Sequence, residues 1–523
     1  MSVFGEHQLG LPYESVADLL TRYAARNPGK TAIVDVDSKS AVTFGELDQL
    51  TIDIGAFLKR RGAGKGRRLL LLSDENLEKL LIWLGAWRIG TVVCPFNTEI
   101  NAKQMVKLAA TLDPALVLYH KDIDIAAMVG SLTAPRLRFG ARTGRDGADT
   151  LDEFFANLPR GRSADEIPER NHAEDVACIF CTSGTTAQPK IVVYDHAAYW
   201  LNGLDTLEFL GLTEDDRTLE YRSFGWNSAQ VLSLLPFLQK GLTLHIARRF
   251  SHSRFFEWVQ TYGITFSAGV PTVLKMLLNK PLGYTSKDIP TLRLMSCSTA
   301  PLTAQQWSQF EEMYGVKLLQ LYGMSETGWV CGNRYYTRKM GTVGLPALHQ
   351  ELKIVDSAGD ECPVDVEGEI TVGGPQMAIG YLREDGSIDP VRGKRIKTGD
   401  LGVRDADGFI RVTGRSKDLI IRGGVNIAPQ EIDEILLRHS GVADAAAVGV
   451  PDEIYGEEVI CYVVAKDKAT DAAAIRSHCE AFLAAAKVPK QVVFVTELPK
   501  SDRGKVLREK LRQDWLERLR LSA

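Results

Sequence analysis

The chain has 523 residues, with 62 Lys and Arg against 66 Asp and Glu, a net charge of −4 and a pI near 6.2. This balance gives no basic excess for nucleic acid or an anionic membrane, and 45% hydrophobic with 24% charged residues excludes disordered and collagen-like classes. Apolar runs such as Leu80–Trp87 fall far short of the about 20 residues that span a bilayer, and the N-terminus shows no signal-peptide pattern. We therefore expect a soluble cytoplasmic enzyme of about three to four domains by length.

The first 130 residues alternate short apolar runs with amphipathic stretches. Thr31–Asp35 predicts a strand, and Thr43 with Glu46 predicts a capping box on a helix that ends near Gly62. Further strands are expected at 68–72, 91–95 and 115–119, and helices at 76–89 and 102–112. This βαβ rhythm predicts a largely parallel sheet covered by helices. The Gly-rich stretch 62–66 follows a helix and precedes a strand, the reverse of a phosphate loop, and is therefore predicted to be a turn.

The eight cysteines are too few for a disulfide scaffold, and we expect reduced thiols. Cys178 and Cys181 have the C-x-x-C spacing of zinc and redox sites, but no second pair or matching histidines complete a zinc site. Because Ile179 and Phe180 are typical of a strand interior, we predict that this pair is structural.

The chain changes character after about residue 350 and again after Arg415. Short strands at 352–355, 369–372 and 409–412, separated by Gly and Asp turns, predict a small β subdomain. A helix from Pro429 to His439, strands at 445–450, 459–464 and 492–495, and a helix at 472–485 then predict a compact α+β unit of roughly 100 residues. A charged amphipathic helix is expected over 507–521.

Two segments have residues suited to phosphates and a base. In Cys181-Thr-Ser-Gly-Thr-Thr-Ala-Gln-Pro-Lys190, an apolar strand leads into hydroxyls, a glycine and a lysine. This composition suits a polyphosphate, although the segment is not a Walker A loop. Leu321-Tyr-Gly-Met-Ser-Glu-Thr-Gly328 combines an aromatic ring, a glycine and a carboxylate, which could stack a base and hold Mg²⁺.

Each of three further segments can be interpreted either as a binding segment or as a surface turn. Lys397-Thr-Gly-Asp400 places a carboxylate after a predicted glycine turn, which suits two ribose hydroxyls. Gly414–Gly424 is rich in glycine and basic residues, and Leu498–Leu507 is a basic loop that presents Lys505.

In this order and at these separations, the five segments resemble the adenylate-forming superfamily of acyl-CoA synthetases, adenylation domains and firefly-type luciferases, over essentially the whole chain. The resemblance implies an α/β fold. A large N-terminal domain of two αβ sheets plus a β subdomain is expected over residues 1–414. A small mobile α+β C-terminal domain carrying the catalytic lysine is expected over 415–523.

The resemblance also implies which residues bind ATP and Mg²⁺. The phosphates would lie on 182–190, the adenine against 298–301 with Tyr322 stacked on it, and the ribose hydroxyls on Asp400. Glu326 and Thr185 would hold Mg²⁺. The expected ATP-binding residues are Thr182, Ser183, Gly184, Thr185, Thr186, Lys190, Ser298, Thr299, Ala300, Pro301, Tyr322, Gly323, Ser325, Asp400, Arg415 and Lys505.

Lys505 would bridge the substrate carboxylate and the α-phosphate, where its charge offsets the repulsion between two anions in the transition state. A rotation about Lys417 would then remove Lys505 and bring Gly423 and Gly424 to the thiol channel. The sequence departs from its relatives at Ala187 and Ile191, where glycines are usual. Both changes stiffen the loop, so slower loop closure is expected while activity is retained.

The resemblance leaves several functions to be compared. Arg422–Glu431 resembles the CoA-ligase form of its motif and predicts an acid–CoA ligase that uses ATP, Mg²⁺ and CoA. The alternative is a stand-alone adenylation enzyme that loads a carrier protein, but Tyr221–Gly241 lacks the acidic residue that grips an α-amino group. Nothing in the sequence separates a luciferase-like oxidising enzyme from a ligase. A non-catalytic nucleotide sensor would be expected to lose Lys505 or Glu326, and both are present.

The acid is predicted from the residues that the resemblance brings to the pocket: Trp226, Asn227, Val270, Cys297, Gly323 and Val330. Trp, Val and Cys suit an apolar or aromatic acid of modest size, although Trp226, at the gating position, could equally be ordinary packing. Arg222 could meet a second carboxylate or form a surface salt bridge. No nucleic-acid partner or membrane span is expected, and a monomer and a homodimer are both possible.

Overall fold

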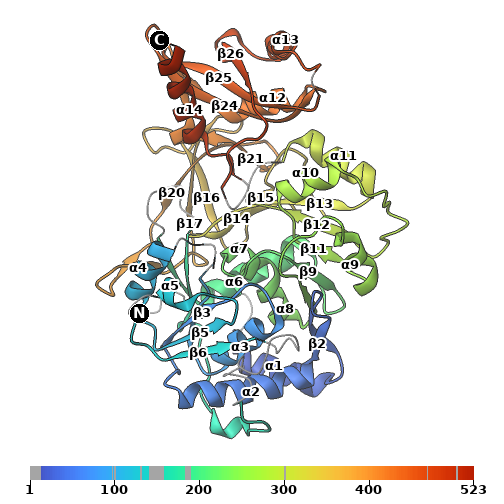
Figure 1. Ribbon diagram of the computed structural model, residues 1–523, viewed down its shortest axis with the longest axis vertical. Coiled ribbons are helices and arrows are strands. Elements are labelled where there is room, and N and C mark those ends of the chain that lie inside the picture. Colours follow the sequence, from blue (N-terminus) through green and yellow to red (C-terminus); the bar gives the residue numbers. More distant parts are fainter. Residues whose placement is uncertain are drawn as a thin grey trace.

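The computed structural model describes residues 13–96, 98, 100, 102–129, 132–140, 158–182, 190–299, 302–467, 469–501 and 505–522. These residues form a large N-terminal domain with two mixed α/β sheets and a four-stranded β-sheet, and a separate C-terminal domain at one end of the molecule (Figure 1). The predicted fold class is therefore confirmed, whereas the boundary at 414/415 stays a prediction. None of the helices formed by the described residues has the length and apolar character needed to cross a membrane.

The first sheet has nine strands in the order β15-β14-β13-β12-β11-β9-β10-β1-β2. From β1 to β13 the neighbouring strands are parallel, and an antiparallel strand or pair borders each side. The strands are β1 Thr31–Asp35, β2 Ser40–Thr43, β9 Arg217–Glu220, β10 Thr243–Ile246, β11 Phe266–Ser267, β12 Leu294–Cys297, β13 Lys317–Met324, β14 Gly328–Gly332 and β15 Leu345–Pro346.

The second sheet has eight strands in the order β19-β18-β8-β7-β4-β3-β5-β6. Its strands are β3 Arg68–Leu72, β4 Val92–Cys94, β5 Leu116–His120, β6 Arg136–Phe139, β7 Val176–Cys181, β8 Ile191–Asp195, β18 Gly380–Leu382 and β19 Ile388–Pro390. The strands predicted at 68–72, 91–95 and 115–119 lie here, whereas Thr31–Asp35 lies in the first sheet. The first 130 residues therefore contribute to both sheets.

Helices cover both faces of each large sheet. The largest core cluster joins residues of both sheets with helix α3, which is buried except at Glu78 and includes Trp83 and Trp87. Two further clusters lie on the outer faces. The predicted capping box of Thr43 and Glu46 is confirmed at the start of α2. The helices are α1 Val16–Arg26, α2 Phe44–Arg60, α3 Leu77–Arg88, α4 Ala102–Leu112, α5 Ile125–Val129, α6 His196–Leu210, α7 Asn227–Ala229, α8 Leu235–Lys240, α9 Phe255–Tyr262, α10 Pro271–Asn279 and α11 Ala304–Tyr314.

The C-x-x-C pair is structural, as predicted. Cys178 and Cys181 are buried in β7, where Cys178 packs in the core between the sheets and Cys181 in an outer core. Burial raises the pKa of the Cys178 thiol to about 12, which keeps it protonated and inert. All eight cysteines are free.

The four-stranded sheet is antiparallel, with the order β16-β17-β20-β21. Its strands are β16 Glu351–Val355, β17 Gly368–Gly373, β20 Ile396–Arg404 and β21 Ile410–Arg415, which confirms the predicted β subdomain. The expected turn at Lys397–Asp400 is wrong, because these residues lie inside β20. Gly399 has a φ of +74° there, and the pairing of β20 with β17 is irregular beside it.

The C-terminal domain contains the expected α+β unit. Its strands are β22 Ile420–Arg422, β23 Val425–Ile427, β24 Val442–Asp452, β25 Gly456–Ala465 and β26 Gln491–Phe494, and its helices are α12 Pro429–Arg438, α13 Ala472–Phe482 and α14 Arg508–Ser522. Between β21 and β22 the chain makes only the short 3₁₀ turn Ser416–Asp418. This turn includes Lys417, the predicted hinge.

Candidate active site

Three predicted site residues from two sheets meet at one carboxylate. Asp400, on β20, is 5% exposed, and its Oδ2 accepts a hydrogen bond from the hydroxyl of Tyr322 at 2.5 Å. Its Oδ1 lies 2.9 Å from Nε of Arg415, the residue paired with it on β21. Because Tyr322 comes from β13, this contact fixes the nine-stranded sheet against the four-stranded sheet.

The phenol of Tyr322 is held in its protonated form. Burial raises its pKa, and the negative charge of Asp400 raises it further. Tyr322 therefore remains a hydrogen-bond donor at neutral pH, and the guanidinium of Arg415 lies beside the Asp400 carboxylate. Asp400 has remaining lone pairs for the two hydroxyls of a ribose.

The predicted phosphate loop joins two antiparallel strands, β7 and β8. At its base, Thr182 N donates to Lys190 O at 2.8 Å, and Lys190 N donates to Thr182 Oγ1 at 3.1 Å. These two bonds close the loop directly beside the Cys181–Ile191 strand pair. The predicted residues Ser183, Gly184, Thr185 and Thr186, together with Ala187, lie outside the described residues.

Tyr381, which no pattern in the sequence indicated, connects the end of that loop to the predicted metal-binding carboxylate. Its hydroxyl donates to Glu326 Oε1 at 3.0 Å, while Lys190 Nζ lies 4.4 Å from the centre of its ring. The pairing of β18 with β8 sets this position, because Tyr381 is opposite Val192 in the register. Burial raises the pKa of Tyr381, and Glu326 adds to the rise, so its hydroxyl remains a donor.

Glu326 lies at the tip of the β13–β14 hairpin, beside Ser325, and a buried polar network holds that hairpin. Asn202 of α6 accepts a hydrogen bond from the backbone N–H of Trp329 at 2.8 Å and donates to Gln376 O at 2.9 Å. Gly328 has a φ of +66°, and a Cβ there would lie 1.9 Å from Asn202 Oδ1. Only glycine fits this close approach, so Gly328 is required at the position where the chain leaves the turn that contains Glu326.

A single carboxylate at this place fits a Mg²⁺ ion that is bound together with ATP. Within the described parts of the chain, no three His, Cys, Asp or Glu side chains form a group that could hold a metal. Mg²⁺ does not need such a cage, because phosphate oxygens and waters supply most of its ligands and one or two carboxylates complete them. The hydrogen bond from Tyr381 leaves lone pairs of Glu326 for this purpose.

The segment before the predicted gate residue, Trp226, is anchored by a fully buried ion pair. Glu75 and Lys79 lie 2.6 Å apart with side chains 3% and 1% exposed. Glu75 Oε1 also accepts hydrogen bonds from Ser223 Oγ at 2.9 Å and from the backbone N–H of Phe224 at 3.0 Å. The start of α3 therefore fixes the approach to Trp226, which is itself partly buried.

Arg222 is not in a surface salt bridge. Its side chain is 9% exposed and forms two hydrogen bonds with the fully buried Glu220, at 2.9 and 2.7 Å. Burial lowers the pKa of Arg222, but Glu220 raises it by more, and the guanidinium stays charged. Arg222 Nη1 also reaches Ser298 Oγ at 3.4 Å. The pair therefore lies at the carboxyl ends of β9 and β12, where parallel sheets bind ligands.

The other predicted pocket and nucleotide residues are spread around this edge. Val270 is the N-cap of α10, Cys297 is the buried last residue of β12, and Asn227 is the buried first residue of α7. Gly323 lies on β13 next to Tyr322, whereas Val330 lies in a core with Val343 and Ile410. Thr299, within the predicted adenine-binding segment, has a φ of +77°, a strained value for a non-glycine residue. Ala300 and Pro301 lie outside the described residues.

Lys505 belongs to a short hairpin that precedes α14. Lys500 pairs with Val506, Ser501 N donates to Lys505 O at 2.8 Å, and Lys505 N donates to Ser501 Oγ at 3.2 Å. Gly423 and Gly424 form the two-residue turn of the β22–β23 hairpin with φ values of +58° and +83°. Positive φ at both positions is the type I′ geometry that explains the two glycines.

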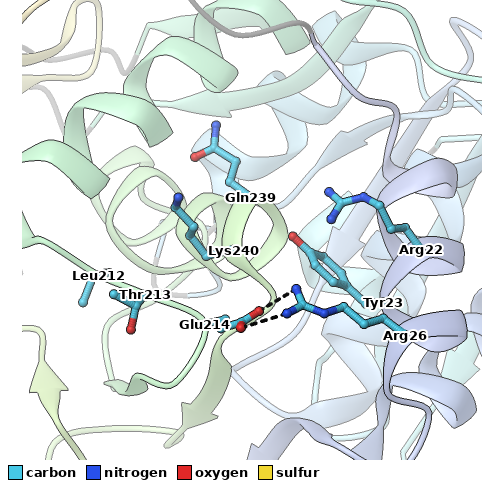
Figure 2. A pocket seen from close by; sticks show the side chains of 8 residues that line it. All are labelled: Arg22, Tyr23, Arg26, Leu212, Thr213, Glu214, Gln239 and Lys240. Carbon is cyan, nitrogen blue, oxygen red and sulfur yellow. Dashed lines mark hydrogen bonds and ion pairs between the residues drawn. The ribbon is translucent and has the colours of Figure 1, made fainter.

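A surface cavity of about 330 Å³ lies elsewhere, between α1 and the end of α8 (Figure 2). None of its lining residues is a predicted site residue, and the ion pair of Arg26 with Glu214 lies along its side. The clusters around Asp400 and Glu326 are therefore not in this cavity.

Comparisons with known proteins agree on one family. The model of the AMP-binding enzyme family matches residues 20–382, and that of the AMP-binding enzyme C-terminal domain matches 431–505. The chain is 32% identical to a sulfoacetate–CoA ligase of Cupriavidus necator over 95% of this chain and 97% of that protein.

Solved structures are also similar to this chain over nearly its whole length. An anthranilate CoA ligase in complex with anthranoyl-AMP is 25% identical, with a TM-score of 0.86 over 97% of this chain and 98% of that one. ATP-bound MatB from Rhodopseudomonas palustris is 27% identical, with a TM-score of 0.85 over 95% of this chain and 99% of that one. The apo form of the same protein gives 0.77 over 96% and 99%.

Proposed function

Because the chain belongs to the AMP-binding enzyme family and is an AMP-forming acid–CoA ligase, we propose that its substrate is a free carboxylic acid of modest size. The observation that supports activation of this acid by ATP is the meeting of separate motifs in two clusters. Tyr322, Asp400 and Arg415 form one cluster, and Lys190, Tyr381 and Glu326 form the other. The first cluster offers a carboxylate to a ribose. The second offers the cation of Lys190 to phosphates and the carboxylate of Glu326 to the Mg²⁺ that accompanies them.

We propose the following use of these residues. Asp400, with Arg415 beside it, binds the ribose, Tyr322 stacks on the adenine, and Lys190 meets the phosphates. Mg²⁺, when bound, neutralises phosphate charge beside Glu326. The acid's carboxylate oxygen attacks the α-phosphorus, and the bond to pyrophosphate breaks. Lys505 stabilises the charge that develops. The thiol of CoA, after losing its proton, then attacks the acyl carbon, and AMP leaves.

The pocket residues favour one class of acid. Trp226, Val270 and Cys297 suit an apolar or aromatic acid. Arg222 lies beside Ser298 at the ligand edge of the sheet, but Glu220 balances its charge. The pair therefore has no net charge to attract a second anionic group, such as that of sulfoacetate, the substrate named for one relative. The same pairing makes Glu220 unavailable for an α-amino group.

A panel of acids tests this proposal. We would measure pyrophosphate release and thioester formation with ATP, Mg²⁺ and fatty, aryl, dicarboxylic and sulfonated acids, with and without CoA. Release and thioester formation with one class identify the substrate. Release with no thioester would favour carrier-protein loading, and no release with any acid would contradict the proposal. We place the enzyme in the reducing cytoplasm, which suits its eight free thiols.

Replacing Tyr381 with Phe is expected to raise the Mg²⁺ concentration needed for half-maximal pyrophosphate release by about 3- to 10-fold. The variant removes the hydrogen bond from Tyr381 to the Glu326 carboxylate. Loss of such a supporting group typically costs about 10- to 100-fold in metal affinity or activity, and the expected effect lies at or below the low end of that range. Mg²⁺ titration of ATP binding checks this without turnover. Tyr336→Phe is the matched control, because its hydroxyl bonds Glu208 at the surface. An unchanged Mg²⁺ requirement in Tyr381→Phe would refute the assignment.

A further inference from the structure

Asp444 lies between the two domains and forms an ion pair on each side. At the start of β24 in the C-terminal domain, its Oδ1 lies 3.2 Å from Nζ of Lys275, which belongs to α10 of the N-terminal domain. Its Oδ2 lies 2.5 Å from Nζ of Lys500. The side chain of Asp444 is 16% exposed, and those of Lys275 and Lys500 are 23% and 32% exposed. The partly buried carboxylate of Asp444 therefore connects α10 with the chain segment that begins at Lys500.

That segment is the hairpin of Lys505. Lys500 pairs directly with Val506, the residue after Lys505, and Leu507 N donates to Pro499 O at 2.8 Å. Just after the second strand of the hairpin, Arg508 donates to Ala447 O at 2.6 Å and pairs with the carboxylate of Asp433. The hairpin is thus fixed to the C-terminal domain, and Asp444 connects its base to the N-terminal domain.

Burial raises the pKa of Asp444, but Lys275 and Lys500 lower it by more, so its carboxylate is charged at neutral pH. Lys275 follows Val270 by five residues on the helix that Val270 caps, so this ion pair lies near the predicted acid pocket. The N-terminal domain meets the C-terminal domain at a second place near the hinge, where a Cβ on Gly414 would lie 3.0 Å from the Cβ of Ala428.

One relative, MatB, has been solved both with ATP and without it. The chain superposes better on the ATP-bound form of MatB than on its apo form, with TM-scores of 0.85 and 0.77 for the same protein. This difference supports the assignment of the Asp444–Lys275 contact to the ATP-bound arrangement.

We propose that Asp444 is a positioning residue that holds the C-terminal domain, and with it Lys505, against α10 for acyl-AMP formation. The inference rests on the proposed function. A rotation about Lys417 separates Asp444 from Lys275, since they belong to different domains, but keeps Asp444 with Lys500. The Asp444–Lys275 pair stabilises one arrangement and not the other, so it shifts the balance between the two half-reactions.

The test compares two Lys→Ala variants that each break an ion pair to an aspartate of β24. Lys275→Ala removes the contact between domains, whereas Lys490→Ala removes the Lys490–Asp452 pair inside the C-terminal domain. We expect Lys275→Ala to slow pyrophosphate release about three- to fivefold, the range of a modest ion pair, and to leave thioester formation from supplied acyl-AMP equal or faster. Lys490→Ala should change neither, and Lys275→Arg should restore the first.

Equal loss of both half-reactions in Lys275→Ala, or no loss, would overturn the proposal. A readout without turnover keeps it distinct from the proposed function. A short bismaleimide should link the variant with both Lys275→Cys and Asp444→Cys, and ATP should raise the yield. A yield no higher than for Lys275→Cys with Lys490→Cys would reject this domain contact, even if no acid were found. If wild type shows no release with any acid while the link forms, the proposed function fails and the contact stands.

Discussion

Pyrophosphate release by Lys505→Ala is expected to fall by about 100-fold or more, while thioester formation from supplied acyl-AMP stays within about twofold of wild type. A cation aimed at charge that develops in a transition state contributes about 100- to 1,000-fold, which sets the first figure. The second follows because the thiol attacks a carbonyl after the α-phosphate has already been joined. Separate assays of the two half-reactions check both.

Lys487→Ala provides the control for removing a lysine from the same domain. Lys487 is paired with Glu431 within the C-terminal domain, so its loss should leave both half-reactions unchanged. A Lys505→Ala variant that loses both half-reactions equally would contradict the two-arrangement mechanism, because Lys505 would then serve both steps.

Local signals in the sequence predicted the elements well. The helix over 102–112 and the strand over 68–72 have the predicted bounds, because the hydrophobic period that indicates each of them lies within a few residues. Strand β2, Ser40–Thr43, was missed, since only its antiparallel pairing with β1 defines it. The division of the first strands between two sheets was missed for the same reason: the partners β10 and β7 lie far along the chain.

In the candidate site, too, residues within motifs were predictable and a residue placed by strand pairing was not. Motif order predicted Tyr322, Asp400 and Arg415, which the structure brings together, but Tyr381 lies outside all five motif segments. Only the register of β18 against β8 places its ring beside Lys190. The ion pair of Arg222 with Glu220 was predictable from the sequence. Glu220 precedes it by two residues in an extended segment, where alternate side chains lie on one face, and that spacing could have indicated an ion pair.

The largest effect on nucleotide chemistry after Lys505 is expected from Glu326→Gln. The variant keeps the shape of the side chain and can still accept the hydrogen bond of Tyr381, but it removes the charge that a Mg²⁺ ion requires. We expect kcat/KM for pyrophosphate release to fall about 100-fold, comparable with the loss of a metal-site group. Thioester formation from supplied acyl-AMP should be spared, since no pyrophosphate leaves in that step. Glu361→Gln, at a surface ion pair, is the control.

Combining Glu326→Gln with Tyr381→Phe separates a positioning role from an independent one. If the Tyr381 hydroxyl acts through Glu326, then removing it from Glu326→Gln should add little, and the double variant should be within about twofold of Glu326→Gln alone. Losses that multiply would mean that the Tyr381 hydroxyl contributes by a route other than Glu326. Tyr381→Leu tests the separate ring contact with Lys190, because it removes the ring as well as the hydroxyl and should raise KM for ATP where Tyr381→Phe does not.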